Sequence, residues 1–303
     1  MYAYKYIENY RYRLFIGDKS VVTNTNNPLQ KYFRQPKIYI RLPSKGKFYP
    51  KGAIEIPESE EFAVYPMTAK DELFFKTPDA LINGESIVEV IKSCVPGIKD
   101  PWMMPSIDSD AILIAIRLAT YGETMEVSAK LPVTGEFRDF EIDLRALLDQ
   151  LSEFEYQQYI QITPDITVEL RPSTYKEFTK TSLKTFEEQR ILRLVDDNTI
   201  SDENKLQAFS NSFKKLTDIT IGMVTDGIVS IDTPDGKVSD RNFIIEFFNN
   251  SDKSMFDIIL KHLESMKNSI KPLKVRSTPE DIAAGVPAEF EIPITFDQSN
   301  FFG

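Results

Sequence analysis

Histidine, tryptophan and cysteine are almost absent from this chain, which has one of each among its 303 residues. The single cysteine, Cys94, has no second thiol for an internal disulfide, which fits a reducing cytoplasm. A Ser-His-Asp or Cys-His mechanism would have to use His262, which lies in an amphipathic helical pattern and is expected to be structural. Trp102 alone offers little surface for stacking against a sugar. These scarcities argue against the common hydrolase mechanisms.

A surplus of positive charge is also missing. The chain has 36 Lys and Arg against 46 Asp and Glu, a net charge of -10. Because phosphate neutralisation needs a basic surface, we expect no nucleic-acid partner. No apolar run approaches the roughly 20 residues of a membrane span, and the N-terminus lacks the apolar stretch of a signal peptide. We therefore expect no membrane partner.

No motif for a phosphate, a metal or a carboxylate pair stands out. Lys45-Gly46-Lys47 lacks the glycine spacing and the Lys-Ser/Thr pair of a P-loop. Asp232, Asp235 and Asp240 miss the alternating spacing of a calcium loop, and a turn accounts for Asp235 while the N-cap of a helix accounts for Asp240. With 46 acidic residues, neighbouring carboxylates are inevitable and do not by themselves indicate a glycosidase. We expect no catalytic residue, no metal ligand and no cofactor, and we expect that the protein is not an enzyme.

The composition instead indicates a well-filled globular chain. Hydrophobic residues make up 42% of the sequence and aromatic residues 12%, enough for a substantial core. The pattern predicts an α+β fold: a mostly helical body with small antiparallel β units and two short hairpins. The predicted segments are a tyrosine-rich arm (1–27), a small β-rich unit (28–77), a helical core with the first hairpin (78–163), a helical region (164–270), and a C-terminal hairpin with a Phe-rich tail (271–303).

Alternation of apolar and polar residues predicts the β elements. Residues 37–67 form one β unit, in which 38–42, 53–56 and 62–65 each alternate. Two later hairpin patterns resemble each other, because Phe140-Glu141-Ile142 and Phe290-Glu291-Ile292 mark their second strands. We expect these two hairpins to lie together and to pair into one small sheet. Chance similarity of two short hairpins is the alternative.

Helical spacing predicts the remaining body. Residues 111–116 are apolar on every side, which places their helix at the centre of a domain, and Cys94 falls on the core face of an earlier helix starting at Thr77-Pro78. Phenylalanine stripes then recur at helical spacing. The stripes comprise Phe178, Phe186, Phe209, Phe213, Phe243, Phe247, Phe248 and Phe256. Such stripes are expected to lie in the core, with an exposed docking face as the alternative.

Both termini carry unusual aromatic content. Tyrosines alternate with polar residues at the N-terminus, and phenylalanines follow the last predicted strand at the C-terminus. These residues are Tyr2, Tyr4, Tyr6, Tyr10 and Tyr12 at one end and Phe296, Phe301 and Phe302 at the other. We predict that the tyrosine arm binds a partner protein, because tyrosine adds contact area at small entropic cost, with a partly ordered tail as the alternative. The phenylalanines are predicted to close the protein's own core beside the 125–144 hairpin.

Several long blocks, in order along the chain, resemble one protein family. The blocks are 27–36, 42–46, 65–72, 77–84, 90–96, 101–108 and 110–123, with looser similarity at 240–244 and in the Phe-Phe tail. Their sequence resembles the baseplate hub assembly proteins of large contractile-tailed (T-even-type) bacteriophages. The similarity begins near Asn27 and extends to the C-terminus. Long collinear blocks are far more specific than a short catalytic motif.

The chain departs from these relatives at one place. Many of them carry Cys-x-x-Cys in the loop that here comprises residues 131–135, and a second cysteine pair in the C-terminal hairpin. Four cysteines at two turns would form a zinc ribbon. This chain has none there. The two hairpins are therefore expected to be zinc-ribbon-like without a metal, held together by packing.

The resemblance implies a non-enzymatic tail protein that helps to assemble the central baseplate hub through protein–protein contacts. The alternative that it leaves open is a chaperone of the tail tape-measure protein. A peptidoglycan hydrolase of the hub and a structural baseplate wedge subunit are less favoured interpretations. Its expected partners are other baseplate hub proteins or the tape-measure protein. Its expected location is the host cytoplasm during phage assembly, with retention in the virion baseplate left open.

Overall fold

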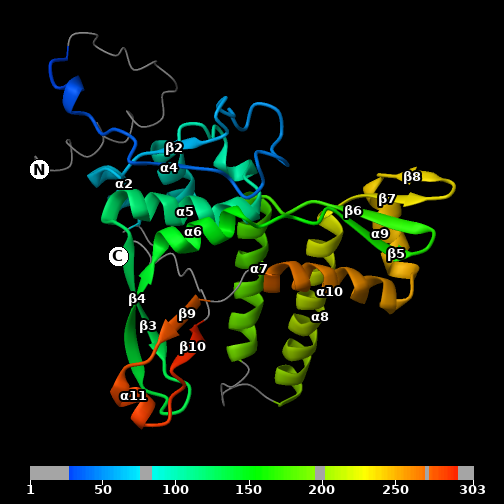
Figure 1. The fold of residues 1–303 in the computed structure, drawn as a ribbon. Coiled ribbons are helices and arrows are strands. Elements are labelled where there is room, and N and C mark those ends of the chain that lie inside the picture. The colour runs from blue at the N-terminus through cyan, green and yellow to red at the C-terminus, as the bar shows by residue number, and fades with distance from the viewer. Residues whose placement is uncertain (1–26, 76–83, 195–201, 270–272, 293–303) are drawn as a thin grey trace, which may run out of the picture. The chain divides into compact units, whose positions relative to one another are not determined.

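The computed structural model describes residues 27–75, 84–194, 202–269 and 273–292, and it combines helices with small antiparallel sheets (Figure 1). The chain divides into two compact units, Met1–Arg34 and Gln35–Gly303. The described part of the first unit holds one short 3-10 helix, η1 (Gln30–Tyr32). The elements discussed below belong to the second unit. The prediction of a mixed α+β fold is confirmed.

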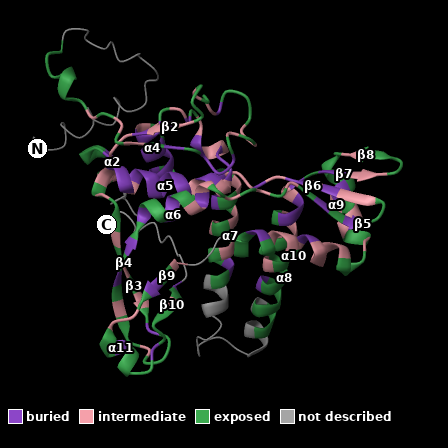
Figure 2. Cartoon of the chain, viewed as in Figure 1, coloured by how far each residue is buried: buried purple, intermediate pink, exposed green. Residues whose placement is uncertain are grey.

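Helix α5 (Ser106–Tyr121) is the centre of the first hydrophobic core, as the sequence predicts. Every residue from 111 to 116 is buried, because an apolar helix surface on all sides requires neighbours on all sides. Figure 2 shows α5 largely in the colour of buried residues. The elements packed around it are α2 (Ala69–Phe75), α4 (Glu85–Cys94), the 3-10 helix η2 (Pro101–Met103), α6 (Leu144–Ser152), β1 (Ile38–Ile40) and β2 (Phe62–Val64).

The predicted β unit at residues 37–67 forms with fewer strands than its alternation suggests. Strands β1 and β2 pair antiparallel, with Ile38 opposite Val64 and Ile40 opposite Phe62. The predicted strand at 53–56 is wrong: only an isolated bridge from Ile54 to Ile98 forms there. Alternation shows which side chains turn inward, whereas a strand also needs a neighbour of matching length.

Helix α4 has the predicted buried face, and Cys94 is fully buried on it. The predicted start at Thr77 lies outside the described residues; the described helix begins at Glu85. Gly84 caps it in the left-handed region at φ 81°, a conformation that glycine adopts without strain. A Cβ atom at Gly84 would also lie 3.1 Å from a side-chain carbon of Thr179.

The second core lies on a four-stranded antiparallel sheet in the order β5-β6-β7-β8. Its strands are β5 (Tyr159–Thr163), β6 (Ile166–Leu170), β7 (Ile228–Thr233) and β8 (Gly236–Val238). Helices α9 (Arg241–Asn250) and α10 (Lys253–Ser269) contribute apolar side chains to it. The predicted cap of α9 is confirmed, since the Asp240 carboxylate accepts hydrogen bonds from the amides of Asn242 and Phe243.

Two long helices connect the sheet strands β6 and β7. Helix α7 (Tyr175–Leu194) and helix α8 (Asp202–Asp226) pack against each other, joined across their seam by an ion pair. Tyr175 at the start of α7 belongs to the first core, and Val224 near the end of α8 belongs to the second. The α7–α8 pair is therefore anchored at the end where α7 begins and α8 finishes.

The two Phe-Glu-Ile hairpins lie together, as predicted, and form a third hydrophobic cluster. The first consists of β3 (Thr124–Lys130) and β4 (Phe137–Asp143), and the second of β9 (Leu273–Arg276) and β10 (Glu289–Ile292). The rings of Phe140 and Phe290 meet edge to face, with centroids 5.4 Å apart. The prediction of one shared sheet is wrong, because each hairpin is a separate two-stranded sheet and side chains alone join them.

Packing and a charged contact hold this pair of hairpins, which we call the hairpin lobe, together. Leu131, in the loop that lacks cysteine, is buried in the cluster. Helix α11 (Pro279–Ala283) begins with a capping box, in which Thr278 and Asp281 satisfy each other's backbone amides. The buried Asp281 carboxylate also lies 2.7 Å from the Arg138 guanidinium on β4. An ion pair and apolar side chains thus connect the two hairpins.

Candidate interaction surfaces

The side chains best suited to chemistry have structural partners. His262 Nε2 lies 3.1 Å from the backbone carbonyl oxygen of Gln157, a contact that orients the ring on the surface of α10. Cys94 lies inside the first core. Across residues 27–75, 84–194, 202–269 and 273–292, no cluster of three or more His, Cys, Asp or Glu side chains is arranged to hold a metal ion.

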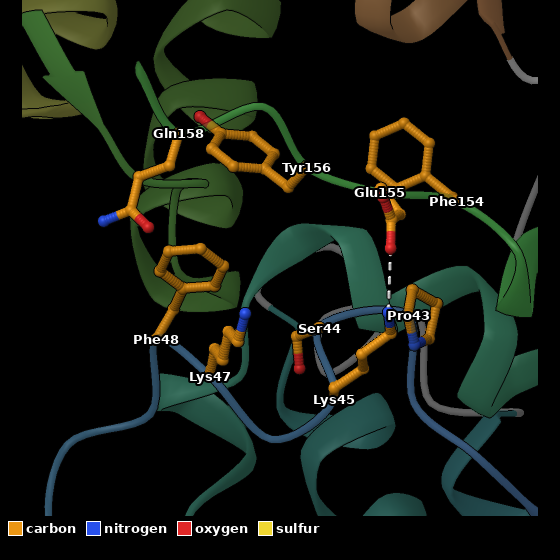
Figure 3. A pocket seen from close by; sticks show the side chains of 9 residues that line it. All are labelled: Pro43, Ser44, Lys45, Lys47, Phe48, Phe154, Glu155, Tyr156 and Gln158. Carbon is orange, nitrogen blue, oxygen red and sulfur yellow. Dashed lines mark hydrogen bonds and ion pairs between the residues drawn. The ribbon is translucent and has the colours of Figure 1, made fainter.

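The loop around Lys45-Gly46-Lys47 borders a hollow of about 150 Å³ (Figure 3). The Lys45 ammonium forms a 2.9 Å ion pair with Glu155, and the ring of Phe48 meets Tyr156 edge to face at 5.5 Å. The amides of Gly46 and Lys47 donate to the Ser44 hydroxyl and carbonyl oxygens, at 3.1 and 3.0 Å. Because these amides bond inside the turn, they do not form a phosphate-binding cradle.

Asp108 on α5 anchors this loop through hydrogen bonds. Its carboxylate accepts hydrogen bonds from the Ser44 amide at 2.8 Å, the Ser44 hydroxyl at 2.6 Å and the Tyr49 hydroxyl at 3.0 Å. Burial raises the pKa of Asp108 to about 6, against the opposing effect of the hydrogen bonds from Ser44 and Tyr49. Burial, reinforced by the Asp108 charge, also raises the pKa of Tyr49. This buried carboxylate organises the loop.

The α7–α8 pair carries a large exposed apolar surface, which we call the helix-pair face. Its six large side chains are Phe178 and Phe186 on α7 and Leu206, Phe209, Phe213 and Met223 on α8. Phe186 is 59% exposed, Phe213 62% and Leu206 72%. The expectation that these stripes lie in the core is wrong here, whereas Phe247, Phe248 and Phe256 do pack on the second core. Figure 2 shows both helices mainly in the colours of exposed and intermediate residues.

The seam between α7 and α8 contains buried polar side chains, and Leu216 and Ile219, which share the helix side of Ser212, are only half-buried. Glu188 and Ser212 are buried there, and Lys215 reaches Glu188 at 3.0 Å. Among the described side chains of 176–189 and 206–223, no large apolar residue is buried. Helical periodicity alone does not reveal this, because a stripe shows which residues share a face and not what covers that face.

Between the two helices, the face is hollowed into a groove of about 310 Å³. Phe178 and Phe186 of α7 and Met223 of α8 form its apolar part. The remaining lining residues are Thr181, Ser182, Thr185 and Gln189. The groove therefore has no charged side chain, in a chain of which 27% is charged.

A second group of exposed apolar side chains lies on the hairpin lobe. Val133 and Phe137 on the β3–β4 hairpin are 60% and 74% exposed, and Ile282 on α11 is also exposed. The ion pair between Arg138 and Asp281, the chain neighbours of Phe137 and Ile282, brings these two segments together. We call these three residues the lobe tip. Residue patterns alone did not indicate them, although Phe137 lies on the outward side of the β4 alternation, opposite Phe140 and Ile142.

The terminal residues selected from the sequence cannot be placed on these surfaces. The predicted partner-binding residues Tyr2, Tyr4, Tyr6, Tyr10 and Tyr12 lie outside the described residues. The same is true of Phe296, Phe301 and Phe302, predicted to close the core. Both assignments stay predictions.

The fold and its surfaces define a mixed α+β protein that displays apolar side chains on two separate substructures. Residues 35–279 match the family described as T4 bacteriophage base plate protein, and the chain belongs to this family. The match covers most of the second unit and begins after the Asn27–Arg34 stretch in which the sequence resemblance starts. No curated protein and no solved structure matches the chain. In the described part of the chain, no helix combines the length and apolar character needed to cross a membrane.

Proposed function

We propose that this baseplate protein is a non-enzymatic assembly factor of the central baseplate hub and acts through protein–protein contacts. The observation that carries the proposal is the exposure of apolar side chains on two substructures with separate hydrophobic clusters, the lobe tip and the helix-pair face. Monomeric proteins rarely expose large contiguous apolar patches, and exposed aromatic residues are common anchors of interfaces. A protein with two such surfaces can hold two partners together.

The lobe tip is the surface that we assign to a hub protein. Phe137 projects from the outward face of a short hairpin whose other face is tied to the second hairpin. An aromatic side chain on a braced strand loses little conformational entropy on binding, which favours it as an anchor. Assembly on the hub would take place in the host cytoplasm, and proteomics of finished particles decides whether the protein remains in the virion.

Replacing Phe137 by serine is expected to weaken capture of hub proteins from infected cells. Loss of an aromatic anchor costs about 2 kcal/mol, or roughly 30-fold in affinity. The melting temperature should not change, because Phe137 is exposed. The measurement is affinity purification of the tagged full chain followed by mass spectrometry.

Asp139→Ser on the same outward face of β4 is the matched control, and it should retain the hub proteins. Equal recovery of hub proteins with wild type and Phe137→Ser would contradict the assignment of the lobe tip. Finding the protein as an abundant component of isolated wedges would instead support the wedge interpretation.

A chaperone of the tape-measure protein is the second candidate, favoured by the uncharged groove between α7 and α8. An amphipathic helix binds by laying its apolar face into such a groove. The same purification separates the candidates: globular hub subunits support hub assembly, and the tape-measure protein alone supports the chaperone function.

The non-enzymatic part of the proposal has its own test. We expect the purified protein to produce no clearing in a peptidoglycan zymogram and to bind no stoichiometric zinc. The chain supplies a single histidine, whose ring contacts a backbone carbonyl, and its one cysteine is in the core. A phage lysozyme is the positive control for the zymogram. Cell-wall lysis by the purified chain, or about one zinc per chain by metal analysis, would overturn this expectation.

A further inference from the structure

The α7–α8 pair keeps its six most exposed large apolar side chains outside the seam that joins the two helices. The seam buries Glu188 and Ser212, while phenylalanine, leucine and methionine side chains face outward. Helices in proteins gain most of their stability by packing an apolar face. The apolar side chains of the helix-pair face therefore need a partner surface that removes them from water.

The exposed apolar side chains recur along both helices. On α8, Leu206, Phe209, Phe213 and Met223 follow one another at spacings that keep them within an arc of about 100°. Leu206 to Met223 spans about 25 Å of helix at 1.5 Å per residue. On α7, Phe178 and Phe186 line the same groove as Met223, so both stripes open to the same side of the pair.

The absence of charged residues on the helix-pair face favours its binding to the same face of a second copy of the chain. Each chain carries a net charge of -10, so two copies repel unless their contact surfaces are free of charge. The residues of the face and its groove are uncharged on both helices. They are Phe178, Thr181, Ser182, Thr185, Phe186 and Gln189 on α7, and Leu206, Phe209, Phe213 and Met223 on α8. A second copy of this face therefore meets no like charge, and a charged partner finds no complement.

The area of the face also suits a two-fold contact. Aromatic side chains bury about 150–250 Å² each, so four half-exposed phenylalanines offer roughly 400 Å². With Leu206 and Met223, the apolar area reaches roughly 600 Å² per copy on the same scale. A standard interface buries about 800 Å² per partner, and the Thr, Ser and Gln side chains of the groove supply the polar remainder.

We propose that the helix-pair face binds the same face of a second copy of this chain, so that α7 and α8 of two protomers form a four-helix bundle. The contact is isologous, with each stripe packing on the partner's stripe about a two-fold axis. The polar seam of each pair then lies at the side of a shared apolar core, as in bundles of antiparallel helices. This dimer goes beyond the proposed function, whose hub contact uses the lobe tip.

The test measures the oligomeric state of the full chain at micromolar concentration by light scattering and sedimentation velocity. Wild type is expected to be a dimer of the 34.8 kDa chain. The double variant Phe186→Ser/Phe213→Ser is expected to weaken the dimer at least about 30-fold and to run as a monomer. Its circular dichroism should match wild type, because both side chains are exposed. Phe137→Ser is the control and should remain dimeric.

A crosslinking measurement tests the geometry independently. The native Cys94 is buried, so an introduced thiol is the reactive one. Ser182→Cys in the groove should give covalent dimers with a short bis-maleimide. Lys184→Cys, exposed on α7 about 160° around the helix from Ser182, should not.

Three results would overturn the proposal. They are a monomeric wild type, a dimer that Phe186→Ser/Phe213→Ser leaves intact, and a trimer or tetramer that this variant dissociates. A monomer whose face instead captures tape-measure helices would assign the groove to that partner. Failure of the dimer leaves Phe137-dependent capture of hub proteins unaffected, so the two proposals fail separately.

Discussion

Replacing Ile114 by aspartate is expected to unfold the protein. Ile114 is fully buried on α5 within a run where every side chain from 111 to 116 is buried. A carboxylate there finds only apolar neighbours of the first core, and an unpaired buried charge costs several kcal/mol. This cost is comparable with the whole stability of a typical domain, about 5–15 kcal/mol. Far-UV circular dichroism and thermal melting of the purified variant measure the effect.

Ile114→Val is the matched control, because it removes one methylene group and adds no polarity. It should cost about 1 kcal/mol and leave the protein folded. If Ile114→Asp melts at the temperature of wild type, α5 is not the centre of the core and this architecture is wrong.

Replacing Asp108 by alanine is expected to destabilise the protein by about 3 kcal/mol at neutral pH. The change leaves the Ser44 amide, the Ser44 hydroxyl and the Tyr49 hydroxyl without their acceptor. Unsatisfied buried donors cost about 1–3 kcal/mol each, partly offset here by removing the desolvation of the carboxylate. Urea denaturation measures the loss. A change below about 0.5 kcal/mol would contradict the role of Asp108 as the anchor of the 43–49 loop.

The raised pKa of Asp108 also predicts a pH dependence. Its folded pKa is about 6 and its ordinary value is 3.8, so between these values the folded protein binds more protons than the unfolded chain. The part of the stability that comes from protonated Asp108 is therefore fully present below pH 3.8 and is lost as the pH rises through 6, whereas the hydrogen bonds that the carboxylate accepts remain at neutral pH. A shift of this size corresponds to roughly 3 kcal/mol.

Asp108→Asn separates this titration from that of the other carboxylates. The amide keeps an acceptor for the Ser44 backbone and does not titrate. The stability of wild type relative to Asp108→Asn should fall as the pH rises from 4 to 7 and should then level off. A difference that is constant across this range, or that grows with pH, would contradict the assignment.

Much of the local structure could be predicted from residue patterns. The all-apolar run at 111–116 could only be the middle of a core, because no face of that helix tolerates water. Asp240 before an apolar helix predicted the cap of α9, and the repeated Phe-Glu-Ile predicted that two hairpins would share one cluster. The resemblance across long ordered blocks indicated a baseplate protein, and residues 35–279 match that family.

The proposed interaction surfaces could not be predicted in the same way. The stripes of Phe178 and Phe213 have the spacing of core residues, yet the seam beside them holds Glu188, Ser212 and Lys215. Phe137 and Phe140 lie three residues apart in one strand, and only the position of the second hairpin makes one exposed and the other buried.

By itself, therefore, the sequence determined the α+β class, the side chains that share each face and the centre of the first core. These follow from local periodicity and from the free energy of burying apolar residues. The tertiary structure decided which faces are covered. It left the helix-pair face and the lobe tip exposed and joined the two hairpins through side chains. Whether a face is covered depends on contacts between residues far apart in the chain, and no local pattern encodes those contacts.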